Sequence, residues 1–395
     1  MLDYEHTNRG KGEEGNMVLL IVFAALSTLI AGTLFSLRYL AAGRFLRRLR
    51  IATVAFDVLA LGWFVVSAMR FHRIGGPSAV ARAIVIVFVA QLFLMAFLLI
   101  AALVRGAWRH MMAVPADAGR RRMLARCAVY PALAAGVGLY GGLVESKATV
   151  DRFFTIPVDG LAAEDAVMIA QISDVHLGNF FSPADLETLL TRIAGHDKKP
   201  DLLAVTGDLF DDEEMNPEAV RVLGAHASDF PDGIWYVLGN HEHFRGAPKI
   251  LSMLKATQVH VLVNAAERVA GRALWIAGTD YPMDRPHFAQ QKRAYAEKAL
   301  GAVPKGVPAV LLAHHPEFID DAAKRNIALT LTGHTHGSQF GLFGMPLFPV
   351  FKYTRGMVRI GGSYGYVHTG NGSWFPFRFG CPPEIAYFAL VPKDA

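Results

Sequence analysis

Four long apolar runs in the first 150 residues restrict the fold of this chain more than any other feature. They cover residues 17–37, 51–69, 80–104 and 127–144. At 1.5 Å of rise per helical residue, about 20 residues cross the roughly 30 Å hydrocarbon core of a bilayer. The pattern predicts a membrane domain of about four transmembrane helices over residues 1–147. Four buried core helices of a water-soluble domain are the alternative.

The charged residues divide in the same way. Residues 1–150 hold 17 Lys and Arg against 7 Asp and Glu, a net charge of +10, while residues 151–395 hold 22 against 27, a net of −5. The positive charge stands in short clusters between apolar runs, which is typical of loops at a membrane surface. A chain that binds nucleic acid needs a basic track on its globular part. No nucleic-acid partner is therefore expected.

The basic clusters also predict an orientation. Residues 38–50 and 105–126, between successive runs, carry 11 positive residues, and the segments on the opposite side carry seven. Positive loops stay in the cytoplasm. We therefore expect a multi-pass protein of the plasma or inner membrane, with both termini and the whole C-terminal part outside the cytoplasm.

A different pattern begins near residue 165, where short strand-like runs alternate with helix-like stretches of about ten to fifteen residues. The strand-like runs are 168–174, 202–208, 234–240, 310–314 and 327–334. Each ends in polar residues, and open α/β sheets assemble their sites at the carboxyl ends of strands. The pattern predicts an α/β domain over residues 148–395 with one polar site.

The polar residues at these strand ends form a set of metal-binding type. They are Asp174, His176, Asp208, Asn240, His241, His314, His334 and His336. Carboxylate, imidazole and amide ligands suit Mn²⁺, Fe²⁺, Zn²⁺ or Mg²⁺, whereas soft metals prefer thiolates. The two cysteines, Cys127 and Cys381, lie far apart in sequence and are expected to stay free. The eight polar residues are seven candidate ligands and a spare histidine, which exceeds the three or four ligands that one ion needs, so the count indicates two ions.

The order of these residues resembles a known family. D-x-H, G-D, G-N-H, a strand-borne His and G-H-x-H follow one another as in the calcineurin-like metallophosphoesterase superfamily. The similarity extends over about residues 150–392 and is closest to bacterial membrane-anchored members, through Ile172-Ser-Asp-Val-His-Leu-Gly178 and Arg378-Phe-Gly-Cys-Pro-Pro-Glu384. This resemblance implies a four-layer αββα sandwich with a centre of two divalent ions, Mn²⁺ in first place and Mg²⁺, Zn²⁺ or Fe²⁺ as alternatives.

The resemblance also implies a role for each residue. Asp174, His176 and His336 are similar to the ligands of the first ion, and Asn240, His314 and His334 to those of the second. Asp208 is similar to the carboxylate that bridges both ions. His241 resembles the histidine that binds no metal and stabilises or protonates the leaving oxygen, with support of the site as its alternative role.

The expected activity is hydrolysis of a phosphate monoester or diester by a metal-activated hydroxide that attacks phosphorus in line. A lipid or lipid-linked phosphate is a candidate substrate, and the bilayer a partner. The alternative function is an inactive membrane scaffold or transporter accessory with the same fold. The sequence indicates neither the leaving group nor the oligomeric state.

Several neighbouring residues have less certain roles. We expect His315 to be a core or supporting residue and His243 either to touch substrate or to cap a helix. The acids 211–214 are expected to form a solvated loop or helix start rather than a third metal site. The loop 366–370 is expected to border the metal site, with Thr369 where the closest relatives tend to carry arginine. The glycine-rich, aromatic stretch 337–374 is either ordinary packing or a rim that contacts lipid.

Overall fold

The computed structural model describes residues 27, 30, 44–71, 78–112, 129–178, 180–373 and 375–393. Contacts within the chain divide it into two compact units, Met1–Val144 and Glu145–Ala395, which we describe separately and call the N-terminal unit and the hydrolase unit. Of the four apolar runs, the first lies outside the described residues except for Ser27 and Ile30.

The described part of the N-terminal unit is helical. Its helices are α2 (Arg44–Phe71), α3 (Ser78–Met112) and α5 (Val129–Leu139), and a π-helical turn, Tyr140–Val144, follows α5. α3 and α5 pack closely, since a side chain at Gly138 would meet the carbonyl oxygen of Ile86 at 2.9 Å. Small residues at such contacts are typical of packed membrane helices.

One described helix in this unit, Ala79–Ile100, is long and apolar enough to cross a membrane, and Ile51–Trp63 is a shorter apolar helix. A single such helix is weak evidence for a membrane, because core helices of water-soluble proteins share its length and composition. The described residues thus give one candidate span where the sequence pattern predicts about four.

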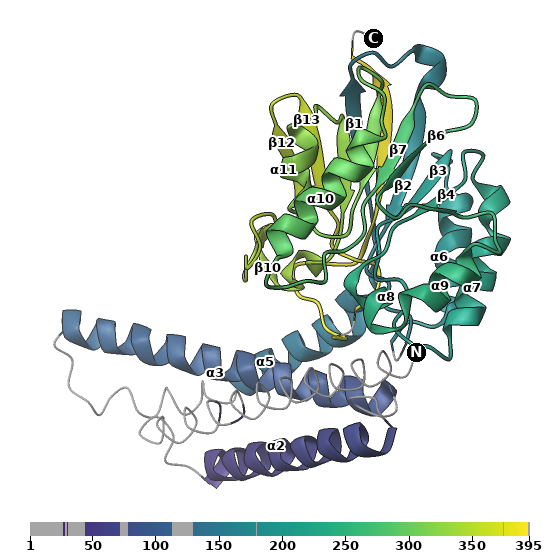
Figure 1. The fold of residues 1–395 in the computed structure, drawn as a ribbon. Coiled ribbons are helices and arrows are strands. Elements are labelled where there is room, and N and C mark those ends of the chain that lie inside the picture. The colour runs from purple at the N-terminus through teal and green to yellow at the C-terminus, as the bar shows by residue number, and fades with distance from the viewer. Residues whose placement is uncertain are drawn as a thin grey trace. The chain divides into compact units, whose positions relative to one another are not determined.

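The hydrolase unit consists of two stacked six-stranded sheets with helices on both outer faces (Figure 1). The first sheet has the order β1-β14-β2-β3-β4-β5, with bounds Val150–Val158, Glu384–Pro392, Val167–Ile172, Leu202–Val205, Ile234–Tyr236 and His260–Val261. The second has the order β12-β13-β9-β8-β7-β6, with bounds Gly356–Ile360, Ser363–Val367, Leu329–Thr332, Ala309–Leu312, Trp275–Gly278 and Ala265–Arg268. A separate hairpin joins β10 (Gly341–Leu342) to β11 (Met345–Pro346).

The central strands run parallel, which brings their carboxyl ends to the same edge. β2, β3, β4 and β5 pair in parallel in one sheet, and β7, β8, β9 and β13 do so in the other. All four residues of β3, Leu202 to Val205, are buried, as expected for a parallel strand covered on both faces.

Three apolar layers hold the sheets and helices together. The middle layer lies between the sheets and includes Ile169, Trp235 and Leu331. The outer layers pack α6 (Pro183–Ala194), α7 (Asn216–Ala225) and α9 (Ala247–Leu254) on the first sheet, and α10 (Phe288–Gly301) and α11 (Phe318–Ala323) on the second (Figure 1). The predicted αββα sandwich is confirmed.

Local sequence fixes the helix that follows β2. Ser182 caps α6 by accepting a hydrogen bond from the Asp185 N–H, the Ser182 N–H donates one to the Asp185 carboxylate, and Pro183 begins the helix. Such a cap stabilises a helix by about 1 kcal/mol. The chain therefore leaves the edge that carries Asp174 and His176 and turns back over the outer face of the first sheet.

Candidate metal centre

The polar residues predicted from strand ends meet between the two sheets. β2 is followed by Asp174 and His176 and β3 by Asp208, while α8 (Asn240–Phe244) begins with Asn240 and His241 soon after β4. From the second sheet, His314 follows β8, and His334 and His336 follow β9. Both sheets thus contribute to one site.

The backbone at this site is strained. Ten described residues other than glycine have positive φ angles, and five of them are candidate ligands: Asp174, His176, Asp208, His334 and His336. For an L-residue this conformation costs roughly 1–2 kcal/mol. Such strain concentrates at functional sites, where the surrounding fold holds it in place.

Asp174, His176 and His336 form the first group of ligand atoms. The Nε2 atoms of His176 and His336 lie 3.0 Å apart, and Asp174 Oδ1 lies 3.5 Å from His336 Nε2. These ligand atoms lie within 4.8 Å of one another, and all three residues are buried. Two ligands that each bind an ion at about 2.1 Å stand about 3 to 3.4 Å apart, so the spacing fits a cation.

Asp208, His314 and His334 form the second group. His314 Nε2 lies 3.0 Å from Asp208 Oδ2 and 3.3 Å from His334 Nδ1. The same Asp208 oxygen lies 3.8 Å from Nε2 of His176, which belongs to the first group. Asp208 therefore stands between the two groups.

Asn240 adds an amide oxygen to the candidate metal site. Its Oδ1 is buried and has no hydrogen-bond partner among the described residues. An unpaired buried carbonyl oxygen costs free energy unless another group meets it. A cation would satisfy this oxygen, so the residues present fit a metal.

Supporting hydrogen bonds orient the imidazoles. His314 donates its Nδ1–H to the carbonyl oxygen of Thr206 at 2.7 Å, which directs Nε2 toward Asp208. His176 directs Nδ1 to Asp211 Oδ2 at 3.3 Å and Nε2 toward the first group. Carboxylates and carbonyls commonly orient metal-binding histidines in this way.

The charges of the site favour a cation. Burial raises the pKa of the Asp208 carboxyl, but the nearby His314 and His241 outweigh burial and hold that pKa well below its usual value. Burial opposes charge on His314 as well, yet Asp208 raises the pKa of His314 to about 10. Burial and then His314 lower the pKa of His334. An anion surrounded by proton-binding groups is a site where a divalent cation can displace protons.

His241 lies beside these groups and faces Asp211. Its Nδ1 lies 2.9 Å from Asp211 Oδ1, and its ring meets the His176 ring edge to face at 4.5 Å between centroids. Burial lowers the pKa of His241, but Asp208 and Asp211 more than offset this and raise it to about 9. Because Asp211 contacts Nδ1 of His241, the Nε2 atom of this ring is available for another partner.

Asp211 is a site residue that the sequence interpretation missed. Its carboxylate accepts bonds from His176, His241 and the Arg245 Nε–H, the last at 2.9 Å. The expectation of a solvated loop or helix start was wrong for Asp211 and correct for Asp212, whose carbonyl accepts the Asn216 N–H at the start of α7. The sequence feature that could have identified Asp211 is its position three residues after Asp208.

Glu242 is a second residue that the sequence interpretation did not assign. Its fully buried carboxylate accepts hydrogen bonds from four backbone N–H groups and one hydroxyl. The donors are the N–H groups of Asp208, Leu209, Phe210 and Gly239 and the hydroxyl of Tyr236. Glu242 thereby joins the loop that carries Asp208 to the turn that carries Asn240.

Two glycines permit the close approach of the loops. A side chain at Gly239 would collide with the Asp208 carboxylate, and one at Gly333 would collide with Ser173 and with the Asp174 carboxylate. The G-N-H and G-H-x-H motifs therefore need glycine for steric reasons. The spacing of the motifs reflects packing as well as ligand chemistry.

Other residues flagged from the sequence lie around this centre. His243 pairs with Asp280 at 2.7 Å, and His315 is buried, 4.8 Å from the Phe288 ring between centroids, which agrees with a core role. The loop 366–370 borders the centre, because a side chain at Gly370 would meet Asp174 and His336 at 3.1 Å. Cys381 is free and buried, and Cys127 lies outside the described residues.

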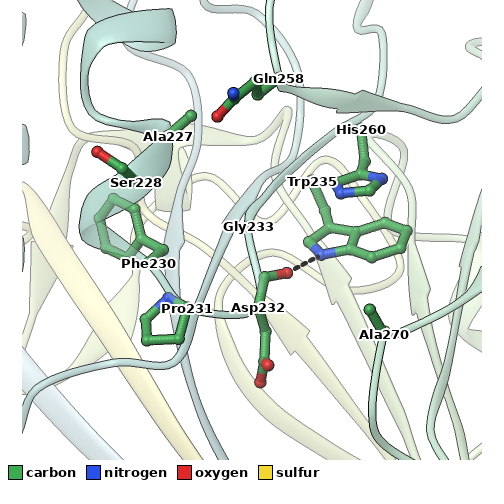
Figure 2. Close-up of a pocket in the computed structure, with 10 residues that line it drawn as sticks. All are labelled: Ala227, Ser228, Phe230, Pro231, Asp232, Gly233, Trp235, Gln258, His260 and Ala270. Atoms are coloured by element: carbon green, nitrogen blue, oxygen red, sulfur yellow. Dashed lines mark hydrogen bonds between the residues drawn. The ribbon is translucent and has the colours of Figure 1, made fainter.

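A separate hollow of about 300 Å³ lies near the amino end of β4 (Figure 2). Figure 2 shows the His260 ring lying on the Trp235 indole, 4.2 Å between centroids, and the indole N–H donating to the Asp232 carbonyl. None of the eight residues at the strand ends lines this hollow.

The chain matches one known protein family. The family model described as calcineurin-like phosphoesterase matches residues 167–338. The chain belongs to this family and is a metal-dependent phosphoesterase, as predicted.

Individual relatives agree with this assignment. An uncharacterized metallophosphoesterase of Helicobacter pylori strain J99 is 30% identical over 266 residues, which cover 65% of this chain and 67% of that protein. The uncharacterized metallophosphoesterase YkuE of Bacillus subtilis strain 168 is 32% identical over 57% of this chain and 79% of its own. The phosphodiesterase YaeI of Escherichia coli K12 is 31% identical over 56% of this chain and 80% of its own.

Proposed function

We propose that the centre binds two divalent cations and that Asp208 bridges them. Asp174, His176 and His336 would complete the shell of the first ion, and Asn240, His314 and His334 that of the second. The position of Asp208 carries this proposal, because one carboxylate oxygen lies 3.0 Å from His314 and 3.8 Å from His176. Carboxylate, imidazole and amide donors suit Mn²⁺, Mg²⁺, Zn²⁺ or Fe²⁺, and the family resemblance implies Mn²⁺ in first place.

The reaction we propose is hydrolysis of a phosphate ester by in-line attack of water. When bound, the two cations would supply a nucleophile near neutral pH and neutralise charge on the phosphate oxygens. The residues of the chain hold this arrangement rigid: Glu242 fixes the loop of Asp208, and Asp211 fixes the ring of His176. Such preorganisation is a main source of electrostatic catalysis.

His241 is the proposed acid. Asp211 accepts a hydrogen bond from its Nδ1, so Nε2 is available to give a proton to the leaving oxygen as the phosphorus–oxygen bond breaks. The resulting neutral imidazole takes a proton from solvent before the next turnover. The substrate is a monoester or a diester, and the name of the relative YaeI supports a diester. Comparing kcat/KM for p-nitrophenyl phosphate and bis(p-nitrophenyl) phosphate decides between them.

We further propose that residues 1–147 form a multi-pass membrane domain of about four helices, with the hydrolase domain 148–395 outside the cytoplasm. The helix Ala79–Ile100 supports the membrane, and the distribution of 11 against seven positive residues supports the orientation. Alkaline phosphatase fused after Ala395 should be active, and a fluorescent protein that matures only in the cytoplasm should stay dark. The reverse pair of results would exclude this orientation.

A lipid or lipid-linked phosphate is the proposed substrate class, since a membrane anchor keeps the site near lipid headgroups. Full-length protein in mixed micelles should hydrolyse phospholipid phosphates faster than soluble nucleotides or sugar phosphates at equal concentration. Exclusive hydrolysis of the soluble compounds would rule out this class.

A further inference from the structure

The hydrolase unit concentrates its exposed apolar side chains in one segment, residues 341–350, which we call the apolar hairpin. Eight large apolar side chains of the described part of this unit are exposed, and six belong to the hairpin: Leu342 46%, Phe343 91%, Met345 66%, Leu347 44%, Phe348 59% and Val350 83%. The other two, Phe153 and Phe244, are 40% and 39% exposed. The hairpin contains no charged residue. Contiguous exposed apolar surface of this kind marks a contact with a membrane or a partner.

Exposure of the hairpin tip to water is energetically unfavourable. Phe343 has the highest exposure of these side chains and a φ of 50°, in the left-handed region that bulky residues avoid. β10 and β11 hold the tip in a defined antiparallel pair, Leu342 opposite Met345. The hairpin is thus a shaped projection at the margin of the unit (Figure 1).

The root of the hairpin lies beside the residue at which the hydrolase unit begins. Gly341 donates its N–H to the carbonyl of Phe379 at 2.6 Å, and the Cys381 N–H donates to the buried carboxylate of Glu145 at 2.8 Å. Glu145 directly follows Val144, the last residue of the apolar run 127–144. The apolar run 127–144 therefore ends one residue before Glu145, which lies at the hairpin root.

The two ends of the hairpin also adjoin the metal centre. It begins five residues after His336, and its last residue is followed by Phe351, whose ring lies 5.2 Å from the His334 ring between centroids. The two ends of the hairpin thus connect directly to segments that carry or contact a candidate ligand of each proposed ion.

We propose that the apolar hairpin inserts into the bilayer that anchors the chain and brings a lipid phosphate to the metal centre from the membrane surface. The inference rests on the proposed membrane domain and deepens the proposed substrate class. The position of Glu145 favours a bilayer as the occupant over a second copy of the chain. The apolar run 127–144, which belongs to the proposed membrane domain, is joined to the hydrolase unit through Glu145, and Glu145 lies at the hairpin root.

Measuring how deeply the hairpin enters a bilayer tests the proposal in the full-length protein. A Cys127→Ser background carrying Phe343→Cys is labelled with the environment-sensitive dye NBD and reconstituted into vesicles of phosphatidylcholine and phosphatidylglycerol containing doxyl-labelled lipid. The Cys127→Ser parent, whose Cys381 is buried, gives the background of labelling. Lys298→Cys, at an exposed position of α10, is the matched control. Phe343 is exposed, so its replacement disturbs no core.

We expect blue-shifted emission at position 343 and quenching at least about three times that at position 298, because interfacial segments bury apolar side chains roughly 5–10 Å deep. Equal emission and quenching at both positions would overturn the proposal. Blue-shifted emission without lipid quenching would assign the hairpin to a protein contact and also overturn it.

NBD emission and quenching do not depend on catalysis, so they test membrane insertion of the hairpin separately from the proposed lipid substrate. Flotation of the Lys298→Cys protein with the vesicles tests the anchor itself. Strong quenching at position 343 in a protein that hydrolyses no lipid phosphate would support the hairpin and refute the lipid substrate.

Discussion

Replacing Asp211 by asparagine tests how much the orientation of His241 contributes to the reaction. The carboxylate accepts bonds from His241 at 2.9 Å, His176 at 3.3 Å and Arg245 at 2.9 Å. Asparagine keeps the shape but replaces one oxygen by an amide that cannot accept a hydrogen bond, and it removes the charge. Both histidines therefore lose their charged partner, and at least one of them also loses its hydrogen-bond acceptor.

The magnitude follows from these contacts. A hydrogen bond to a charged group contributes about 1.5–3 kcal/mol, and each 1.36 kcal/mol in a barrier changes the rate tenfold. We expect kcat to fall roughly 10- to 100-fold, the range also typical of losing a group that orients a metal-binding histidine. Metal must be supplied in excess, because His176 also loses its orientation.

The assay is hydrolysis of bis(p-nitrophenyl) phosphate at saturating metal, with the metal content measured on the same sample. Asp229→Asn is the matched control, since Asp229 pairs with His226 at 2.6 Å outside the metal centre and should leave kcat unchanged. A kcat for Asp211→Asn equal to that of the parent protein would refute the assigned role of Asp211.

Three further substitutions separate metal binding, proton transfer and stability. Asp208→Asn should lower both metal content and rate, because the carboxylate between the two groups loses its charge; full metal content would contradict its bridging role. His241→Ala should keep its metal while kcat falls roughly 10²- to 10⁴-fold, less for a good leaving group such as nitrophenolate; equal impairment with good and poor leaving groups would refute its role as acid. Glu242→Gln should lower the free energy of unfolding by at least about 2 kcal/mol, since it leaves two or more buried donors without an acceptor at about 1–3 kcal/mol each. An unchanged melting temperature in detergent would contradict that assignment.

The sequence predicted the α/β class and the location of its polar site because both depend on local pattern, whereas the sandwich was expected from the family resemblance. Buried parallel strands read as short apolar runs, and the residues after them share one edge of the sheet. Asp174, Asp208 and His314 could therefore be placed near one another without a structure. In the structure, Nε2 of His314 lies 4.0 Å from Asp174 Oδ1 and 3.0 Å from Asp208 Oδ2. The individual ligand roles of these residues stay predictions.

The supporting residues were beyond this reasoning, since their roles arise only when separate loops meet. Asp211 stands in a run of acids whose composition suggests solvent, and only the fold turns it toward His176 and His241. Glu242 follows two obvious site residues, but its donors come from two loops that local pattern does not bring together. The membrane domain was predicted from apolar length alone, and the first run lies outside the described residues.

The metal content of the full-length protein tests the central claim most directly. Elemental analysis of active protein, purified without chelator, should find two divalent transition-metal ions per chain. Removing them with a chelator should abolish hydrolysis of bis(p-nitrophenyl) phosphate, and adding Mn²⁺ should restore it. One ion per chain at full activity, or activity that survives complete removal of metal, would contradict a centre of two ions bridged by Asp208.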